Sequence, residues 1–233
     1  MEKYSIETKT SYILGISLIV EALKETANTI VKVYLSSKAN KNSELDKLID
    51  LCKINNVPII EDDEFIHKIS LKENCYGVGV FNKYQKELET DKHLVLYKFN
   101  DEGEFGTIIR SATSFDYKDI VLIDSNIDIY NPKVIRASMG SFFHVNIKKY
   151  STLNEYFDDY KYNIYPFSSD GNRELKTLKF TKPYSIIIPG NYHLLDDMFI
   201  DACYIKHSNF EEISLTSLSS IVLNYAYHLN LKR

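Results

Sequence analysis

The sequence predicts two α/β domains, the second larger than the first and built on a largely parallel sheet. Two observations indicate this class. Short runs rich in Val, Ile and Tyr alternate with amphipathic runs along the whole chain, as strands and helices alternate in α/β proteins. A polar stretch without apolar periodicity, residues 82–92, divides these runs into two sets and is the best candidate for a linker.

The first set predicts a small α/β layer of alternating helices and strands. The periodicity of each run and its flanking residues decide the type of element. In order, the pattern predicts an amphipathic helix over 13–26, a strand over 31–37, a helix over 43–56 capped by Ser43, a short buried strand over 57–60, a weak helix over 62–69 and a strand over 76–81.

The second set has the alternation typical of parallel strands joined by helices. Strands are predicted over 93–99, 119–123, 142–147, 161–167 and 184–188, and helices over 106–115, 132–138 and 151–160. Apolar residues recur at helical spacing in 214–229, so a helix closes the chain. We expect any chemistry to lie in this second domain.

The composition of the chain limits the classes of protein to which it can belong. Among the 233 residues no apolar run approaches the ~20 that a membrane span needs, and the first ten residues lack the order of a secretory signal. We therefore expect a cytoplasmic protein with no membrane partner. The three cysteines, Cys52, Cys75 and Cys203, are odd in number and widely spaced, so we expect neither a disulfide framework nor a metal site.

Net charge counts against a protein that binds nucleic acid through its overall charge. The formal charge is −4, with 12 Lys and Arg against 14 Asp and Glu through Thr90 and 16 against 18 after it. Such binders have a strong positive excess. Any RNA partner must therefore be met by a local group of Lys and Arg.

Ligands of parallel sheets bind in the loops beyond the carboxyl ends of the strands. Three loops qualify, 99–106, 189–197 and 206–214, and the first two carry glycines that permit a positive φ and a close approach of backbone to ligand. Arg110 stands one turn into the apolar run that follows the first loop. Its spacing leaves two interpretations open: a solvated position on the polar face of the helix, or a guanidinium that holds a phosphate or favours ionisation of a hydroxyl.

Four segments resemble the SpoU/TrmH branch of the SPOUT RNA methyltransferases. GTIIRSATSF at 106–115, followed by NPKVIRASMG at 131–140, is similar to that family's first motif and the conserved run beyond it. IIIPGNYHL at 186–194 resembles the second motif, and EISLTSLSSIVLNYAYHL at 212–229 the third. The resemblance reaches the front of the chain, where YILGISLIVEALKET and CYGVGVF stand in the place of the family's small ribosomal-protein-like domain.

The resemblance implies fold, cofactor and partners. It implies an α/β chain with a small ribosomal-protein-like RNA substrate-binding domain at 1–86, a linker at 87–92 and a SPOUT methyltransferase domain with a trefoil knot at 93–233. It also implies a homodimer that binds S-adenosylmethionine and methylates a ribose 2′-hydroxyl of rRNA or tRNA. By position, the cofactor pocket is expected at Pro189, Gly190, Asn191, Ile205, Ser214 and Leu215.

The reaction chiefly requires alignment of two reactants and a more nucleophilic hydroxyl. Arg110 matches the family's arginine and would stabilise the developing alkoxide or fix the adjacent phosphate. Lys133 and Arg136, in the best-matching segment, are candidates for contacts with the RNA backbone, with solvated helix charge as the alternative.

Several polar motif residues depart from the family pattern. Glu104 stands in place of Asn, Tyr192 in place of Glu, His193 in place of Gly and Thr216 in place of Asn, and the N-terminal H-Q-G has become Cys75, Tyr76 and Gly77. Glu104 would be a general base if burial raised its pKa, or would repel RNA phosphates. Besides an active methyltransferase, the sequence therefore leaves open an inactive RNA- or ribosome-binding relative and an unrelated small-molecule α/β enzyme.

Overall fold

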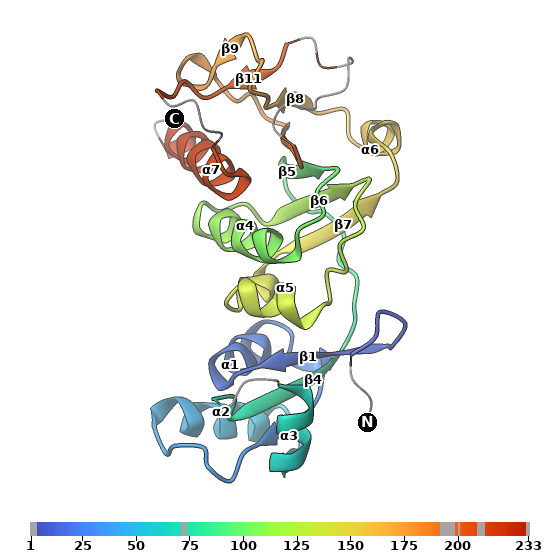
Figure 1. Ribbon diagram of the computed structural model, residues 1–233, viewed down its shortest axis with the longest axis vertical. Helices are drawn as coiled ribbons and strands as arrows, with labels where there is room; N and C mark the ends of the chain where they lie inside the picture. The colour runs from blue at the N-terminus through green and yellow to red at the C-terminus, as the bar shows by residue number, and fades with distance from the viewer. Residues whose placement is uncertain (1–3, 71–73, 192–198, 200, 209–212, 232–233) are drawn as a thin grey trace. The chain divides into compact units, whose positions relative to one another are not determined.

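The computed structural model describes residues 4–70, 74–191, 199, 201–208 and 213–231 (Figure 1). The chain forms two compact units. The first contains Met1–Tyr84 together with Asp128–His144, and the second contains Gln85–Ile127 and Val145–Arg233. Each unit is an α/β layer with its own sheet, which confirms the predicted fold class.

The first unit is a four-stranded mixed sheet of order β1-β4-β2-β3 with helices packed on it. Its strands are β1 Thr10–Leu14, β2 Ile30–Leu35, β3 Ile59–Glu61 and β4 Gly77–Asn82, and its helices are α1 Ile16–Glu25, η1 Ala27–Thr29, α2 Ser43–Ile54, α3 Asp63–Ile69, α5 Pro132–Ala137 and η2 Ser141–His144. Strand β4 runs antiparallel to both β1 and β2.

The helix predicted over 13–26 is wrong in its first turn, because a strand precedes it. β1 ends at Leu14 and α1 begins at Ile16, with Gly15 between them at φ 121°. That backbone conformation is open to glycine and strained for other residues, and it lets the chain change direction in one residue. The apolar residues of β1 and α1 are separated only by Gly15 and Ser17, so periodicity did not distinguish the two elements.

Two further expectations in this unit need correction. The cap of α2 is Asn42 rather than Ser43, because the Asn42 side chain accepts hydrogen bonds from the backbone N–H groups of Glu44 and Leu45 at 3.1 and 2.9 Å. The short strand expected to be buried is exposed along its whole length, since β3 is an edge strand that pairs only with β2. Only Val57, before the strand, is buried.

The segment Asp128–His144 belongs to the first unit although it follows β6 (Asp119–Ile123), a strand of the second unit, in the sequence. The Ser11 hydroxyl donates to the Tyr130 carbonyl at 2.5 Å, and the Tyr84 backbone N–H donates to the Tyr130 hydroxyl at 3.1 Å. Phe143 packs edge-on against Phe81, with ring centres 5.8 Å apart. These long-range contacts, rather than sequence order, fix the position of α5.

The second unit contains a five-stranded parallel sheet of order β7-β6-β5-β10-β8. The strands of this unit are β5 Lys92–Tyr97, β6 Asp119–Ile123, β7 Asn146–Tyr150, β8 Asn163–Pro166, β9 Arg173–Glu174, β10 Tyr184–Pro189 and β11 Cys203–Tyr204, and its helices are α4 Glu102–Ser114, α6 Leu153–Asp159, η3 Leu175–Thr177 and α7 Leu215–Leu231. β9 and β11 form a separate two-stranded sheet.

Two boundaries in this unit differ from those predicted. Helix α4 begins at Glu102, four residues before the predicted start, because the Asp101 side chain accepts from the Glu104 backbone N–H at 2.8 Å and caps it. The strand predicted over 142–147 begins only at Asn146, since Phe142 and Phe143 lie in the 3₁₀ turn η2.

Helices cover the parallel sheet. On one face, α6 places Leu153 and Tyr156 in a buried cluster with alternate residues of β5, β6 and β10. Helices α4 and α7 lie side by side (Figure 1), and the hydroxyls of Ser111 and Ser220 are 2.8 Å apart. In the described part of the chain, no helix combines the length and the apolar character that a membrane crossing requires.

Candidate active site

The parallel strands β5 and β10 are neighbours in the middle of the second sheet, and their carboxyl ends form the floor of the candidate site. Pro189, the last residue of β10, is buried and pairs in register with Tyr97, the last residue of β5. The connection from β5 leads outward to β6 on one side, while β10 lies on the other. This reversal of strand order is where ligands bind in open α/β sheets.

Gly190 follows β10 and packs directly on the end of β5. Its backbone N–H donates to the Tyr97 carbonyl at 2.7 Å. A Cβ atom at Gly190 would lie 2.1 Å from the carbonyl oxygen of Lys98, far inside van der Waals contact. The sequence predicted a glycine that permits a positive φ and a close approach of backbone to a ligand, but among the described residues only Gly15 and Gly140 are glycines with a positive φ. Gly190 is required for close approach instead.

The second candidate segment, which contains Ile205, is connected to the first, the Pro189–Gly190 turn, through neighbouring backbone. The Phe167 N–H donates to the Ile187 carbonyl of β10 at 2.9 Å, and Phe167 also forms a bridge with Cys203 of β11. Ile205, two residues beyond Cys203, is half-buried. The structure therefore brings the Pro189–Gly190 turn and the Ile205 segment to adjoining parts of the same edge.

The third candidate segment is the start of α7. Ser214 precedes the helix, and its hydroxyl accepts from the Ser217 backbone N–H at 3.3 Å, as a capping residue does. Leu215 is the first helical residue and is half-buried. Asn191, the remaining cofactor candidate, is exposed. The motif positions Tyr192 and His193 lie outside the described residues.

Arg110 lies in α4 with its side chain exposed. In the described ranges its guanidinium has no hydrogen bond and no ion pair, and only its backbone carbonyl is engaged, by the Ser114 hydroxyl at 2.9 Å. A guanidinium with five unsatisfied donors suits an oxyanion or a phosphate. Removing it should therefore cost the fold little.

Glu104 is half-buried in the first turn of the same helix. Six residues separate it from Arg110, which corresponds to roughly 120° around the helix and about 9 Å along it. The two side chains therefore leave α4 from different faces. The sequence suggested both as catalytic candidates, but the structure does not place them together in one chain.

Lys133 and Arg136 lie on α5, in the first unit, and both side chains are exposed. The Asn131 side chain caps this helix by accepting from the Lys133 N–H at 2.9 Å, and Pro132 occupies its first turn. The two cations are three residues apart, so they are neighbours on one helix face. They thus belong with the first unit and not with Arg110.

A buried polar network, which the sequence did not predict, lies at the amino end of the parallel sheet, opposite the candidate site. His93 Nδ1 lies 2.8 Å from the Tyr156 hydroxyl, which lies 2.6 Å from that of Ser185. The Asp119 carboxylate accepts from Asn146 at 2.8 Å. Burial lowers the pKa of His93, and the charge of Asp119 opposes that shift. The sequence carried a signal, since His93 and Asp119 stand at the start of otherwise apolar strands and charged side chains are rarely buried.

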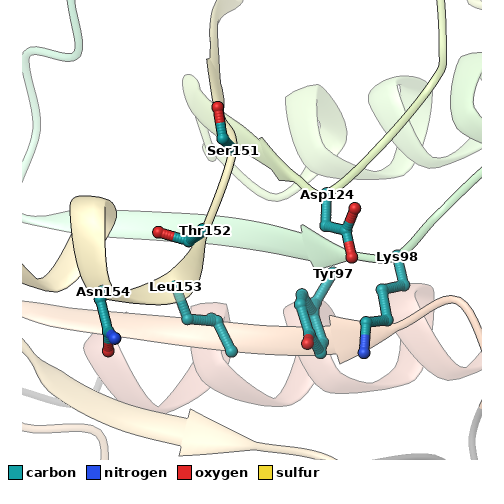
Figure 2. A pocket seen from close by; sticks show the side chains of 7 residues that line it. All are labelled: Tyr97, Lys98, Asp124, Ser151, Thr152, Leu153 and Asn154. Carbon is teal, nitrogen blue, oxygen red and sulfur yellow. The ribbon is translucent and has the colours of Figure 1, made fainter.

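Sequence reasoning also missed a pocket at the carboxyl end of the sheet, beside Lys98 (Figure 2). The signal was the register: Lys98, Asp124 and Ser151 each follow the last residue of a parallel strand. Within the described ranges, no cluster of His, Cys, Asp or Glu could hold a metal ion. Burial raises the pKa of the Cys203 thiol to about 11, so this thiol stays protonated near neutral pH.

Residues 91–191 match the model of the SpoU rRNA Methylase family. The match begins at the start of β5 and ends one residue after Gly190, so it spans the turn described above.

Curated relatives agree with this match. The chain is 26% identical over 161 residues to the 23S rRNA (guanosine(2553)-2'-O)-methyltransferase RlmP of Bacillus subtilis, covering 69% of this chain and 62% of the relative. It is 31% identical over 147 residues to the mitochondrial rRNA methyltransferase 3 of Mus musculus, covering 57% of this chain and 33% of the relative. The chain thus spans less than two thirds of either relative.

Solved structures share the fold. The SpoU methyltransferase AviRb from Streptomyces viridochromogenes, in complex with the cofactor AdoMet, superposes with a TM-score of 0.82 at 14% identity. The superposition covers 96% of this chain and 91% of that one. Both units of the present chain therefore have counterparts in the fold of that structure.

Proposed function

We propose, from the premise that residues 91–191 belong to the SpoU rRNA Methylase family, that this chain is an S-adenosylmethionine-dependent RNA methyltransferase. The acceptor is a ribose 2′-hydroxyl of rRNA or tRNA. The observation that carries the proposal is the Gly190 turn, which packs on the Lys98 carbonyl inside the matched segment. This turn lies at the carboxyl ends of the strands, where α/β sheets bind ligands.

The residues present fit the cofactor. Gly190 leaves no space for a Cβ beside the Lys98 carbonyl, so at this position the turn offers only backbone groups to a ligand. Asn191, Ile205, Ser214 and Leu215 complete the set that would hold S-adenosylmethionine, and none of the six carries a charge. When bound, the cofactor supplies an activated methyl group.

Arg110 is the residue proposed to act on the acceptor hydroxyl. Its exposed guanidinium, which has no hydrogen-bond or ion-pair partner among the described residues, would stabilise negative charge as the hydroxyl loses its proton, or hold the adjacent phosphate. The angular separation on α4 argues against a joint action of Arg110 and Glu104 from the same chain. Glu104 is then a modulator of RNA binding through its charge, although a role as general base stays part of the hypothesis.

The remaining parts of the proposal concern RNA and assembly. The domain at 1–86 binds substrate RNA, residues 87–92 are a linker, and 93–233 form the methyltransferase domain with its trefoil knot. Lys133 and Arg136 contact the RNA backbone, supported by their exposure on one face of α5. The protein acts as a homodimer, supported by Ile221, an exposed apolar residue on α7.

A second candidate is a non-catalytic relative that keeps the fold to bind RNA or ribosomes. The observation that favours it is Glu104, a half-buried carboxylate at a position where the family pattern has a neutral amide. Thr216, half-buried in the first turn of α7, is a further departure at a motif position. Both changes affect polar side chains while the Gly190 turn is kept.

The test is methyl transfer to RNA. Purified protein is incubated with S-adenosylmethionine and with rRNA or tRNA from a strain that lacks the gene, and nucleosides are analysed by mass spectrometry. A 2′-O-methylated nucleoside that wild type produces and Arg110→Ala does not would support the proposal. Cofactor-independent RNA binding with no methylated nucleoside in any RNA fraction would support the second candidate instead.

A further inference from the structure

A pocket opens at the carboxyl end of the parallel sheet in the second unit (Figure 2). Its volume is about 230 Å³. It is lined by Tyr97, Lys98, Asp124, Ser151, Thr152, Leu153 and Asn154. These residues come from the ends of β5, β6 and β7 and from the first turn of α6.

The backbone holds two charged residues at the rim of this pocket. Lys98 and Asp124 follow β5 and β6 and have left-handed backbone conformations, with φ of 54° and 50°. The Lys98 N–H donates to the Ile123 carbonyl at 2.9 Å, and the Asp124 N–H donates to the Tyr150 carbonyl at 3.1 Å. Both residues are thus bonded to the adjacent strand, so their side chains start from fixed positions.

Opposite charges lie over an apolar floor. The floor is Tyr97 and Leu153, each 5% exposed. The Lys98 ammonium lies 4.8 Å from the centre of the Tyr97 ring, and in Figure 2 the Asp124 carboxylate lies above that ring. Within the described ranges the Asp124 carboxylate has no hydrogen-bond or ion-pair partner. A ligand that combines a negative group, a hydrogen-bond donor and a ring or sugar would match the charge of Lys98, the carboxylate of Asp124 and the floor.

We infer that this pocket binds one nucleotide of single-stranded RNA, next to the nucleotide that is methylated. Lys98 contacts its phosphate, Asp124 accepts a hydrogen bond from a ribose hydroxyl, and the Tyr97–Leu153 floor contacts the sugar or base. The inference rests on the proposed function, since it assigns a second part of the substrate to the same edge of the sheet.

Size and position support this ligand. The volume lies below the roughly 300–1,000 Å³ of pockets that enclose drug-sized molecules, so the pocket suits the phosphate and ribose of one nucleotide rather than a duplex or a whole cofactor. The carbonyl of Lys98 touches the Gly190 turn, so a nucleotide held by Lys98 lies beside the proposed cofactor site. The ribose follows the phosphate along the strand and carries one free hydroxyl, the 2′-hydroxyl, which we assign to Asp124 because Lys98 and Asp124 line the same pocket.

The test uses the full chain and a 12-nucleotide single-stranded RNA of mixed sequence, with DNA of the same sequence as a second probe. Lys98→Gln should weaken RNA binding about tenfold and reduce the slope of log affinity against log salt by about 0.7, the loss of one phosphate contact. Lys98→Arg should keep the slope. Asp124→Asn should reduce the preference for RNA over DNA, and asparagine, like aspartate, tolerates this left-handed backbone conformation.

Two variants at the amino edge of the sheet are matched controls. Lys118→Gln removes an exposed lysine, and Asp116→Asn changes an exposed aspartate that also has a left-handed φ of 59°. Neither should change RNA affinity or the salt slope. Melting temperatures of all variants establish that they are folded.

Four results would overturn the inference. The first is unchanged affinity and slope in both Lys98→Gln and Asp124→Asn. The second is loss of S-adenosylhomocysteine binding in Lys98→Gln with RNA binding intact, because the pocket would then hold part of the cofactor. The third is no RNA binding by wild type. The fourth is methyl transfer by wild type and equally by Lys98→Gln, which would reject this pocket while the proposed function stands. RNA binding that depends on Lys98, without any methyl transfer, would reject only the proposed function.

Discussion

The backbone N–H of Gly190 donates a 2.7 Å hydrogen bond to the carbonyl of Tyr97, which joins the turn after β10 to the last residue of β5. The next carbonyl, that of Lys98, occupies the space where a Cβ of residue 190 would stand. The two strand ends are therefore held together by a contact that only glycine permits. The cofactor site proposed here and the nucleotide pocket beside it both depend on this contact.

Gly190→Ala should separate the two strand ends. Because the clash is with backbone at 2.1 Å, the chain must shift, and overpacking of this kind costs about 1–3 kcal/mol. Urea unfolding should show a loss in that range, and calorimetry should show no binding of S-adenosylhomocysteine. Ser17→Ala, a small change at an exposed position of α1, is the control and should alter neither quantity. Unchanged cofactor affinity in Gly190→Ala would contradict the placement of the site.

Arg110→Ala should abolish methyl transfer with a melting temperature within about 2 °C of wild type. The side chain is exposed and forms no hydrogen bond or ion pair with the described residues, so the fold loses little when it is removed. Activity assays and thermal melts on the same preparation measure both quantities. A fall in melting temperature of many degrees would instead assign Arg110 a structural role.

Glu104→Asn should strengthen RNA binding. The carboxylate lies in the first turn of α4, and a neutral amide there removes its repulsion of incoming phosphates. The gain should shrink as salt rises, because salt screens this repulsion. Asp158→Asn, which removes an exposed carboxylate of α6 outside the proposed RNA-binding domain, is the control. Lost methyl transfer in Glu104→Asn at undiminished RNA affinity would assign Glu104 the role of general base.

Ile221→Glu should convert a dimer to monomers. Ile221 is 43% exposed on α7, and a charge at an apolar interface disfavours association. Light scattering at micromolar protein measures the mass. Ile54→Glu tests specificity, because Ile54 is 74% exposed on α2 and should leave the mass unchanged. A monomeric wild type would remove the homodimer from the proposal.

The stability of the second unit should depend on His93. Burial lowers the pKa of this histidine in the folded state, so as pH falls the unfolded chain binds a proton before the folded chain does. The free energy of unfolding should therefore decrease below the unfolded pKa of about 6.5, by up to about 1.4 kcal/mol per pH unit, until the folded pKa is reached. Denaturation between pH 5 and 8 measures this slope.

A conservative variant identifies the group that titrates. His93→Gln should lose most of this pH dependence, although it should also be less stable than wild type. His67→Gln changes a histidine exposed on α3 and should keep the dependence. A slope unchanged in His93→Gln would assign the titration to other groups.

Much of the fold could be predicted because the local signals agree with the tertiary structure. The uninterrupted apolar runs of β5, β6 and β10 are typical of central parallel strands, and all three are buried there. The start of α4 was missed although Asp101 and Glu104 have the spacing of a helix-capping pair, because the two glycines nearby suggested a loop. The short β1 was missed because its apolar residues merge with those of α1.

The candidate site was less predictable, because it is made by long-range contacts. Gly190 was selected from the sequence for backbone freedom, whereas the structure requires it for contact with Lys98, 92 residues earlier in the chain. No local pattern places α5 with the first unit, since the partners of Tyr130 are Ser11 and Tyr84. The same holds for the His93 network, which joins residues of β5, α6 and β10.

Calorimetric titration of the purified wild-type protein with S-adenosylmethionine, with S-adenosylhomocysteine in parallel, tests whether this chain binds the cofactor of a methyltransferase. We predict micromolar binding at about one site per chain, which Gly190→Ala abolishes. No binding of either compound up to millimolar concentration would contradict a methyltransferase and favour the non-catalytic RNA-binding relative.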